Sequence, residues 1–198
     1  MAQTIPRADC MAPDDDMPLK GLRVVEFGQF IAAPAAAQTL ADLGADVIKV
    51  EPPTGDAARV VGWHDHYGPM FTAYNRSKRS VVLDLRSEAG RAHALKLACS
   101  ADVVLQNSRP GVMERQGLGS ARLMALAPRL IYGQVSGFGQ EGEASVRPGF
   151  DIAAQAESGM MSLNGDADGD PTRVGFTVVD TMSGHALATG VLAALVRR

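Results

Sequence analysis

The stretch LRVVEFGQFIAAPAAAQTLADLGADVIKV, residues 22–50, decides the fold class, because it reads as strand, helix and strand in succession. Residues 22–27 and 46–50 are short apolar runs of the kind that form strands buried on both faces of a sheet. Residues 34–43 begin with proline, are rich in alanine and leucine, and are followed by glycine, which is typical of a helix. This order of elements is characteristic of α/β proteins with a parallel sheet.

The same alternation continues through the rest of the chain. Further strands are expected at residues 80–85, 103–105, 130–135 and 176–179. Further helices are expected at residues 88–99 with Ser87 as N-cap, at 121–127 with Ser120 as N-cap, at 151–158, and after Asp180. We therefore predict an α/β fold with a mostly parallel sheet and helices on both faces. Ligands of such sheets bind beyond the carboxyl ends of the strands, where Glu26, Glu51, Asn107, the Gly137 turn and Asp180 all fall.

Composition excludes several classes of protein. Apolar residues make up 46% and charged residues 21% of the chain, which is ordinary for a soluble globular protein. The net charge of −3 gives no overall basic field that would attract nucleic acid. Cys10 and Cys99 fall in an expected tail and an expected helix, which argues against a disulfide or a thiolate metal site and fits a reducing cytoplasm.

The N-terminal residues are expected to stand apart from the domain. Residues 1–17 are rich in aspartate and proline and lack the apolar core of a signal peptide, so we predict a mobile extension there. Residues 18–198 then form one domain segment, and no apolar run in it approaches the length of a membrane span.

Three motifs are typical of ligand sites but fit loops better. GFGQEG, residues 137–142, matches a dinucleotide fingerprint, yet no helix begins inside it and it follows the fifth strand rather than the first. NGDADGD, residues 164–170, is similar to a calcium loop, but Gly175 stands where a bidentate glutamate is required. His64 and His66 have a chelating spacing without an evident third ligand. We predict a flexible loop, an acidic turn and a solvated loop, and no metal site.

Two groups of cations flank the predicted crevice. Residues 75–80, NRSKRS, hold three cations, and residues 107–117 add Arg109 and Arg115. A guanidinium group forms two charge-assisted hydrogen bonds to a phosphate, which makes arginine suited to phosphate binding. Each group alone is usually a solvated surface. Together they predict a site for an anionic ligand.

Asp180 has two interpretations from its local sequence. Aspartate is a common N-cap, so capping of the helix that follows is the first of them. Ser183 and Gly184 have little bulk and leave room for a substrate. A helix N-terminus also favours the ionised carboxylate that a nucleophile needs. Capping and catalysis both stay open, and His185 has no assigned role.

Six blocks of sequence occur in an order typical of one enzyme family. They are LKGLRVVEFGQFIAAPAAAQTLADLGADVIKVEPPTGD (19–56), NRSKRSVVLDLRSEAGR (75–91), NSRPGVMERQGLG (107–119), PRLIYGQVSGFGQEG (128–142), RPGFDIAAQAESGMMSLNGDADGDPTRVG (147–175) and VVDTMSGHALATGVLAAL (178–195). Over residues 18–198 the chain resembles the family III CoA-transferases, the CaiB/BaiF family. That family includes formyl-CoA transferase, carnitine CoA-transferase and the α-methylacyl-CoA racemases.

The resemblance implies a Rossmann-like large domain in which Asp180 is the nucleophile of a CoA transfer. Its carboxylate would form an anhydride with a donor acyl group and then an aspartyl-CoA thioester, from which a carboxylic acid takes the CoA. The residues that match the family's CoA contacts are Leu83, Arg86, Asn107 and Arg115. CoA and acyl-CoA are then substrates, no cofactor is tightly bound, and the family forms interlocked homodimers.

The chain also departs from the family pattern. Ser108 stands where an aromatic residue is common, and Gln29 and Ile31 replace the histidine and glutamine of formyl-CoA transferase. Phe150 replaces the histidine that racemases use, which favours transfer over racemisation. Family members continue beyond the position of Arg198. We therefore expect the chain alone to be weakly active or inactive. The alternatives are a racemase-like enzyme, a non-catalytic CoA-binding remnant, or one partner of a complementary chain.

Overall fold

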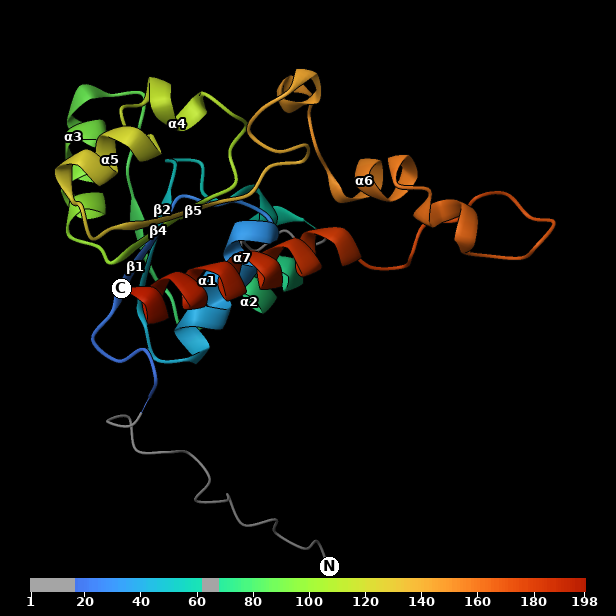
Figure 1. Cartoon of the computed structure of the whole chain (residues 1–198), viewed down its shortest axis with the longest axis horizontal. Coiled ribbons are helices and arrows are strands. Elements are labelled where there is room, and N and C mark those ends of the chain that lie inside the picture. Colours follow the sequence, from blue (N-terminus) through green and yellow to red (C-terminus); the bar gives the residue numbers. More distant parts are fainter. Residues whose placement is uncertain (1–16, 62–67) are drawn as a thin grey trace, which may run out of the picture.

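The structure, a computed structural model, describes residues 17–61 and 68–198 and has a five-stranded sheet at its centre (Figure 1). The strands are β1 Arg23–Glu26, β2 Asp46–Glu51, β3 Arg79–Val82, β4 Val103–Gln106 and β5 Ile131–Gln134. All pairings in this sheet are parallel, and the order is β3-β2-β1-β4-β5. The order reverses between β1 and β4, so the loops leaving these strands diverge and open a crevice. The predicted α/β fold with a mostly parallel sheet is confirmed.

Helices cover both faces of the sheet (Figure 1). They are α1 Ala32–Asp42, α2 Pro69–Asn75, α3 Glu88–Cys99, α4 Val112–Arg115, α5 Ser120–Leu126, α6 Asp151–Glu157 and α7 Val178–Arg197, with 3-10 turns η2 Ala57–Val60, η3 Glu143–Val146 and η4 Met160–Leu163. Successive strand residues face opposite sides of a sheet. Val24 thus joins a core with Leu40 of α1 and Ala188 of α7, whereas Val25 joins a core with Ala94 of α3 and Leu123 of α5.

Helices α1 and α7 pack closely against each other, and Gly184 permits this contact. A Cβ atom on Gly184 would lie 2.7 Å from the Ala32 carbonyl oxygen and 2.7 Å from the Ala35 Cβ. Both distances are shorter than any normal contact, so a larger residue would push the two helices apart. The alanine-rich face of α1 completes this close fit, and the pair fixes where α7 begins.

Helix α7 crosses the whole domain. Its first turn lies at the carboxyl edge of the sheet, and its last residues reach the opposite edge, where the Arg198 guanidinium donates a hydrogen bond of 2.9 Å to Asp102, just before β4. By length and composition α7 is also the one helix of the described residues that could cross a membrane. The core helices of soluble proteins pass the same test, and α7 buries Gly184, Ala188 and Val191 against the domain.

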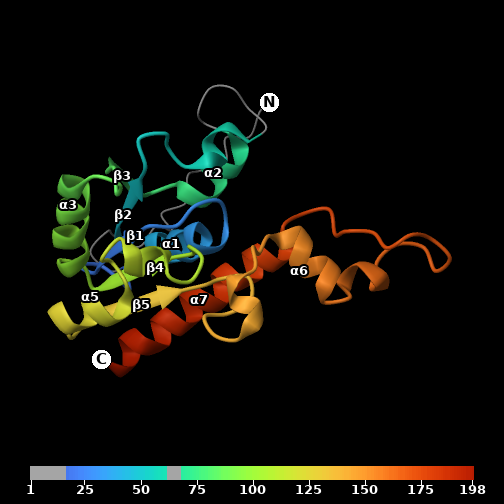
Figure 2. The ribbon, with the colours of Figure 1, turned by 90° about the horizontal axis from the view of Figure 1, so that it is seen from above.

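Between β5 and α7 the chain leaves the body of the domain. In Figures 1 and 2, α6 and the segment that follows it project beyond the sheet. Of the predicted N-terminal extension at residues 1–17, all but Met17 lies outside the described residues. Met17 itself packs against the backbone of Gly44.

The strand predicted at residues 176–179 is wrong. Phe176 is 59% exposed and unpaired with any strand, and α7 already begins at Val178. A short apolar run does not distinguish a strand from the start of a buried helix. The segment is helical here because two amides in the first turn of α7 donate hydrogen bonds to the Asp151 carboxylate, which stabilises the start of the helix.

The two predicted N-caps fare differently. Ser87 caps α3, and its hydroxyl accepts a hydrogen bond of 2.9 Å from the Gly90 amide. Ser120 is the first residue of α5 rather than its cap, and Gly119 occupies the capping position. The remaining predicted strands and helices are confirmed within one to three residues at each end.

Candidate functional site

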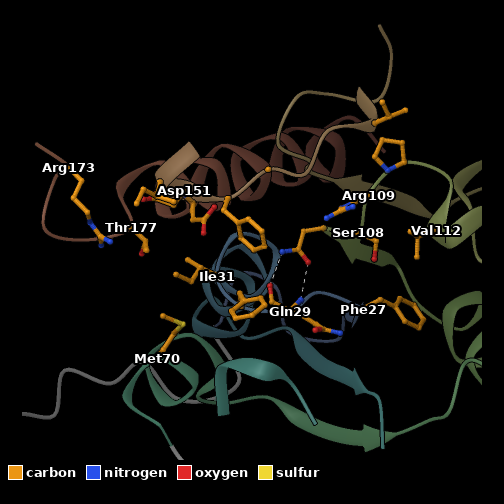
Figure 3. A pocket seen from close by; sticks show the side chains of 18 of the residues that line it. Phe27, Gln29, Ile31, Met70, Ser108, Arg109, Val112, Asp151, Arg173 and Thr177 are labelled. Carbon is orange, nitrogen blue, oxygen red and sulfur yellow. Dashed lines mark hydrogen bonds between the residues drawn. The ribbon is translucent and has the colours of Figure 1, made fainter. Parts of the chain in front are cut away.

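A cavity of about 780 Å³ opens at the carboxyl edge of the sheet (Figure 3). Its walls come from the loop after β1, the segment between β4 and α4, the start of α6 and the first turn of α7. Met70 of α2 and Arg173 complete the lining. This is the crevice that the reversal of strand order between β1 and β4 predicts.

The loop after β1 is held from the side by Asn107. The Asn107 side chain accepts a hydrogen bond of 2.9 Å from the Gln29 amide and donates one of 2.8 Å to the Gln29 carbonyl oxygen (Figure 3). The next residue, Phe30, has a φ of 61°, a left-handed conformation that is uncommon outside glycine. Its amide donates to Asp56 at 3.2 Å. Asn107, a predicted CoA contact, therefore lines the cavity but also shapes the loop opposite.

Beneath the same loop lies a buried ionic cluster of Glu26, Lys49, Asp56 and Lys78. The Lys49 ammonium lies 2.9 Å from Glu26 and 2.8 Å from Asp56, and it donates to the Gly28 carbonyl oxygen at 2.9 Å. Lys78 lies 2.7 Å from the other oxygen of Glu26. All four side chains are at most 2% exposed. The sequence suggested that Glu26 faces the crevice, and this is wrong. Glu26 is buried in the ionic cluster, which anchors the loop that lines the crevice.

The two lysines of the cluster have pKa values shifted in opposite directions. Burial disfavours the charge of both, but Lys49 lies between Glu26 and Asp56, whose charges raise its pKa above the ordinary value. Burial lowers the pKa of Lys78 to about 8, because Glu26 compensates only in part and Lys49 adds a like charge. A protonated Lys49 between two carboxylates is the arrangement that best balances the four charges.

The cations of residues 75–80 do not reach the cavity, contrary to the sequence expectation. Lys78 pairs with Glu26 in the buried ionic cluster. Arg76 pairs with Asp42, and Arg79 pairs with Asp46 at 2.6 Å. Asp42 ends α1 and Asp46 begins β2. The sequence alone did not show that these two carboxylates lie close to Arg76 and Arg79. The Glu51 carboxylate is also paired, since Arg59 and Ser80 both donate hydrogen bonds to it.

Asp180 lines the cavity as the third residue of α7. It does not cap that helix. The Asp151 carboxylate accepts hydrogen bonds from the amides of Val179 at 2.8 Å and Asp180 at 3.1 Å, and so takes the capping role. In the part of the chain that the structure describes, no side chain donates a hydrogen bond to the Asp180 carboxylate. Of the two interpretations of Asp180, the structure removes capping.

The pKa of Asp180 is raised, chiefly by burial and further by the negative charge of Asp151. The helix N-terminus was expected to favour the ionised carboxylate, and burial and Asp151 act against that effect. Burial removes water that would solvate the carboxylate, and the neighbouring anion opposes a second charge. The same desolvation makes the ionised form of Asp180 a stronger nucleophile.

Sequence reasoning missed Asp151 and Gln155 as members of the site. Gln155 is fully buried and donates to the second oxygen of Asp151 at 2.6 Å. Its side-chain oxygen accepts from the Val174 amide at 2.9 Å. The sequence shows an aspartate at the start of a predicted helix, which is a recognisable signal, but its partners lie 28 and 29 residues further along the chain.

The residues predicted to contact CoA or another anionic ligand divide into two groups. Arg109 and Arg115 line the cavity on the β4 side, and no carboxylate of the described residues pairs with either. Leu83 packs into the core between the sheet and α3. Arg86 is largely exposed and lies 3.1 Å from Asp84. The structure therefore brings Asn107, Arg115 and Asp180 together around one cavity, and leaves Leu83 and Arg86 outside its lining.

The segment GFGQEG forms a loop, as predicted, and its first glycine has a packing role. A Cβ atom on Gly137 would lie 2.5 Å from the Gly149 Cα, and one on Gly149 would lie 2.4 Å from the Gly137 Cα. The two ends of the loop therefore touch through bare backbone. Only the short 3-10 turn η3 follows Gly142, and no α-helix begins inside the segment, so the geometry of a dinucleotide fingerprint is missing.

Potential metal ligands do not gather in the described residues, where no group of three or more histidine, cysteine, aspartate or glutamate side chains could hold an ion. His64 and His66 lie outside those residues. The segment NGDADGD forms a turn in which the Gly169 amide donates to Asp166. His185 is exposed on α7.

A second cavity of about 100 Å³ adjoins the first. Asn107, Gly149, Phe150 and Asp180 border both of them. The Asp180 carboxylate therefore has open space on two sides, which is the steric condition for a group that must be approached by one molecule and left by another.

Comparison with known proteins identifies the fold and the family. A family model described as CoA-transferase family III matches residues 19–198. A probable fatty acyl-CoA transferase of Mycobacterium tuberculosis is 45% identical over 185 residues, which cover 91% of this chain and 47% of that protein. A succinyl-CoA–D-citramalate CoA-transferase of Chloroflexus aurantiacus is 42% identical over 184 residues, which cover 91% of this chain and 46% of that protein.

Solved structures agree with this result. A CaiB/BaiF family protein from Brucella suis superposes with a TM-score of 0.88 at 39% identity, covering 92% of this chain and 50% of that one. The orthorhombic crystal form of the Mycobacterium tuberculosis protein gives a TM-score of 0.84 at 45% identity, covering 92% and 51%. The chain thus spans about half the length of the relatives it matches.

Proposed function

The chain belongs to CoA-transferase family III, and on that basis we propose that it carries the nucleophile and part of the CoA site of an enzyme that moves CoA from an acyl-CoA thioester to a free carboxylic acid. One observation carries the proposal. Asp180 borders a cavity of about 780 Å³. Asp151, and not Asp180, accepts the hydrogen bonds that cap α7, and no described side chain donates a hydrogen bond to the Asp180 carboxylate. A carboxylate held in this way is available for covalent chemistry.

The proposed reaction proceeds through two anhydrides. An oxygen of the Asp180 carboxylate attacks the thioester carbon, the carbon–sulfur bond breaks, and CoA thiolate leaves. The thiolate then attacks the aspartyl carbonyl carbon, which releases the donor acid and forms an aspartyl-CoA thioester. The acceptor carboxylate attacks that carbonyl and again expels the thiolate. The thiolate finally takes the acyl group from the second anhydride, which restores the Asp180 carboxylate.

The charges around the cavity support this assignment of substrates. Arg109 and Arg115 lie together on its β4 side without carboxylate partners, as a site for phosphate groups of CoA requires. Binding would exclude water from a cavity in which a thioester and an anhydride must survive. The CoA contacts predicted for Leu83 and Arg86 stay predictions, and require the ligand to extend past the cavity over β3.

The proposal predicts that Asp180→Asn abolishes formation of an acyl-enzyme adduct, because the amide is not a nucleophile at this step. Incubation of the chain with an acyl-CoA, followed by intact-mass measurement, should show an adduct on the wild-type protein and none on the variant. Binding of CoA by calorimetry should change by no more than about twofold, since the substitution leaves Arg109 and Arg115 in place. Asp168→Asn, at an exposed position outside the cavity, is the matched control. An adduct of unchanged yield on Asp180→Asn would refute the assignment.

A racemase-like activity is the second candidate, and Phe150 argues against it. Phe150 borders both cavities and stands where the family resemblance places the proton-transferring histidine of racemases. A phenyl ring moves no proton. Exchange of the α-hydrogen of a 2-methylacyl-CoA with deuterated solvent would identify the racemase reaction. A protein that binds CoA but yields neither adduct nor exchange would be the non-catalytic alternative.

A further inference from the structure

Lys78 is a buried cation that the proposed reaction does not use, and its hydrogen bonds reach three different elements. Its ammonium group donates to the Glu26 carboxylate of β1 at 2.7 Å, to the Pro34 carbonyl oxygen of α1 at 2.9 Å and to the Asn75 side-chain oxygen of α2 at 2.9 Å. An ammonium group has three N–H donors, so all of them are used. Only 2% of the Lys78 side chain is exposed, so water has little access to replace a bond that is lost.

The bond to Asn75 fixes the last turn of α2. Asn75 is 9% exposed and ends this helix. Its side-chain nitrogen donates to the Phe71 carbonyl oxygen at 2.9 Å, one turn earlier, while its side-chain oxygen accepts from Lys78. The end of α2 is thereby attached to the buried ionic cluster, and through the cluster to β1.

The same turn of α2 contacts α7 beside the proposed nucleophile. The Tyr74 hydroxyl lies 3.2 Å from Thr181 Oγ1, and Thr181 directly follows Asp180. Thr181 Oγ1 donates its own proton to the Thr177 carbonyl oxygen at 2.8 Å, so Tyr74 is the donor in the contact between the two hydroxyl groups. Because Tyr74 and Asn75 are consecutive residues, a shift of Asn75 moves the hydroxyl group that holds the first turn of α7.

Of the two lysines in the cluster, Lys78 loses its proton more readily. The charged groups that act on it are Glu26, Lys49 and Asp56, whereas α1 and α2 contribute the neutral acceptors named above. Burial and the like charge of Lys49 outweigh the two carboxylates and lower the pKa of Lys78 to about 8. A neutral amine keeps only two N–H donors, so loss of the proton leaves one of the three acceptors without its bond.

Asn75 is the acceptor that this loss affects. The Glu26 carboxylate is charged and keeps the stronger bond. The Pro34 carbonyl oxygen belongs to α1 and also accepts from the backbone amide four residues later in that helix. In the described part of the chain, no other group donates to the Asn75 side-chain oxygen. Deprotonation therefore detaches the end of α2 from the cluster.

From these contacts we propose that Lys78 is a positioning residue for the Asp180 site, whose bond to Asn75 holds α2 and, through Tyr74, the first turn of α7. The inference rests on the proposed function and adds to it a means of regulation by pH. Below about pH 8 the ammonium form keeps α2 attached, and above it the neutral amine releases α2. Met70 of α2 lines the cavity, so release changes both a wall of the cavity and the turn that carries Asp180.

Methyl NMR of ¹³C-labelled methionines tests the inference without turnover. Met70 reports on α2 and Met182 on the start of α7, and a leucine substitution at each assigns its signal. Between pH 6 and about 10, both wild-type signals should shift with a shared midpoint near pH 8. Lys78→Gln carries the two donors of a neutral amine and should lack this transition. Lys96→Gln, at an exposed position in the last turn of α3, should keep it.

Tyr74→Phe tests the link between the two helices and serves even if Lys78→Gln does not fold. Without the hydroxyl group, Met70 should still titrate near pH 8, whereas Met182 should not. A wild-type Met70 signal that does not move, or an identical transition in Lys78→Gln, would show that Lys78 does not position α2. An unchanged Met182 transition in Tyr74→Phe would show that α2 does not position α7 through Tyr74.

Adduct formation separates this inference from the proposed function. If both hold, the initial rate in the wild-type protein should fall at least about threefold below its maximum by about pH 9.5, and Tyr74→Phe should be slow at both pH values. If the methyl signals titrate as expected but acyl-CoA leaves no adduct on Asp180, the positioning role stands and the covalent mechanism fails. If the adduct forms and neither methyl signal titrates near pH 8, the mechanism stands and the positioning role fails.

Discussion

Two aspartates lie side by side at the start of α7 and have different tasks. Asp151 is buried and accepts hydrogen bonds from both amides of the first turn and from Gln155. Asp180 accepts none from the described side chains and borders open space. The environment rather than the residue type therefore separates a structural carboxylate from one that is free to react.

The pair predicts a shift in pH dependence. Adduct formation requires ionised Asp180, so its rate should rise with pH through the raised pKa of this residue. Asp151→Asn keeps an oxygen for the α7 amides but removes the like charge, so the rise should move to lower pH. The variant loses the hydrogen bond from Gln155, at a cost of about 1 kcal/mol. The initial rate of adduct formation between pH 4 and about 8 is the measurement, with Asp168→Asn, at an exposed position outside the cavity, as control. An unmoved profile would show that burial alone shifts Asp180.

At this scale the sequence predicted which residues line the cavity better than it predicted ion-pair partners. Asp180, Asn107 and Arg115 were found because each follows a predicted strand or belongs to a recognisable block, and all three line the cavity. Glu26, Lys78 and Arg79 were misplaced because their ion-pair partners are 23 to 52 residues away in the chain. Pairing over such separations depends on strand order, which no local pattern reveals.

Helix α7 is the element on which the site depends most, and two of its glycines test how it packs. Gly184→Ala places a Cβ against the Ala32 carbonyl and the Ala35 side chain, and should destabilise the fold by about 1–3 kcal/mol. Gly190→Ala meets no atom within 4 Å and should stabilise it by about 1 kcal/mol through helix propensity. Chemical denaturation of both variants gives the two free energies of unfolding.

The two substitutions are a matched pair, because they add the same methyl group to the same helix. Equal stabilisation by both would mean that α1 and α7 separate freely. Since Asp180 is attached to this helix, Gly184→Ala should also slow adduct formation, whereas Gly190→Ala should leave it unchanged.

Elements were predicted well wherever hydrophobic periodicity was strong. The five strands of the sheet and α1, α3 and α6 appear at the expected places. The exception, residues 176–179, is a short apolar run whose structure is decided by the carboxylate of Asp151 in another helix. Local sequence favoured a strand, and a tertiary contact made the segment the start of α7.

Across the whole molecule, the buried ionic cluster joins β1, β2, the segment just before β3 and the loop that lines the cavity. The folded-state pKa of Lys78 is about 8 and its ordinary value is 10.5. Between these values the folded protein has released a proton that the unfolded chain still holds, so the free energy of unfolding gains a contribution as pH rises. That contribution is complete above 10.5 and is lost as pH falls through 8.

Lys78→Met should therefore remove a rise in stability that the wild-type protein shows between pH 8 and 10.5. Urea denaturation at a series of pH values compares the two proteins. Lys96→Met, at an exposed position in the last turn of α3, should keep the rise. The same slope in Lys78→Met and wild type would assign the pH dependence to other groups. The predicted homodimer and cytoplasmic location concern the whole protein and stay predictions.

The backbone contact between Gly137 and Gly149 has an evolutionary consequence. Because the two ends of the loop meet at the domain surface, residues 138–148 form a detachable cassette whose length matters little to the sheet behind it. Insertions or deletions there would leave Asp180, the proposed nucleophile, and its hydrogen-bonded neighbours in place. They would still remodel one side of the cavity, since Val146 lies on its lining. If the proposed function holds, descendants of such a chain could acquire new acids as substrates by exchanging one surface loop while the sheet and the start of α7 stay the same.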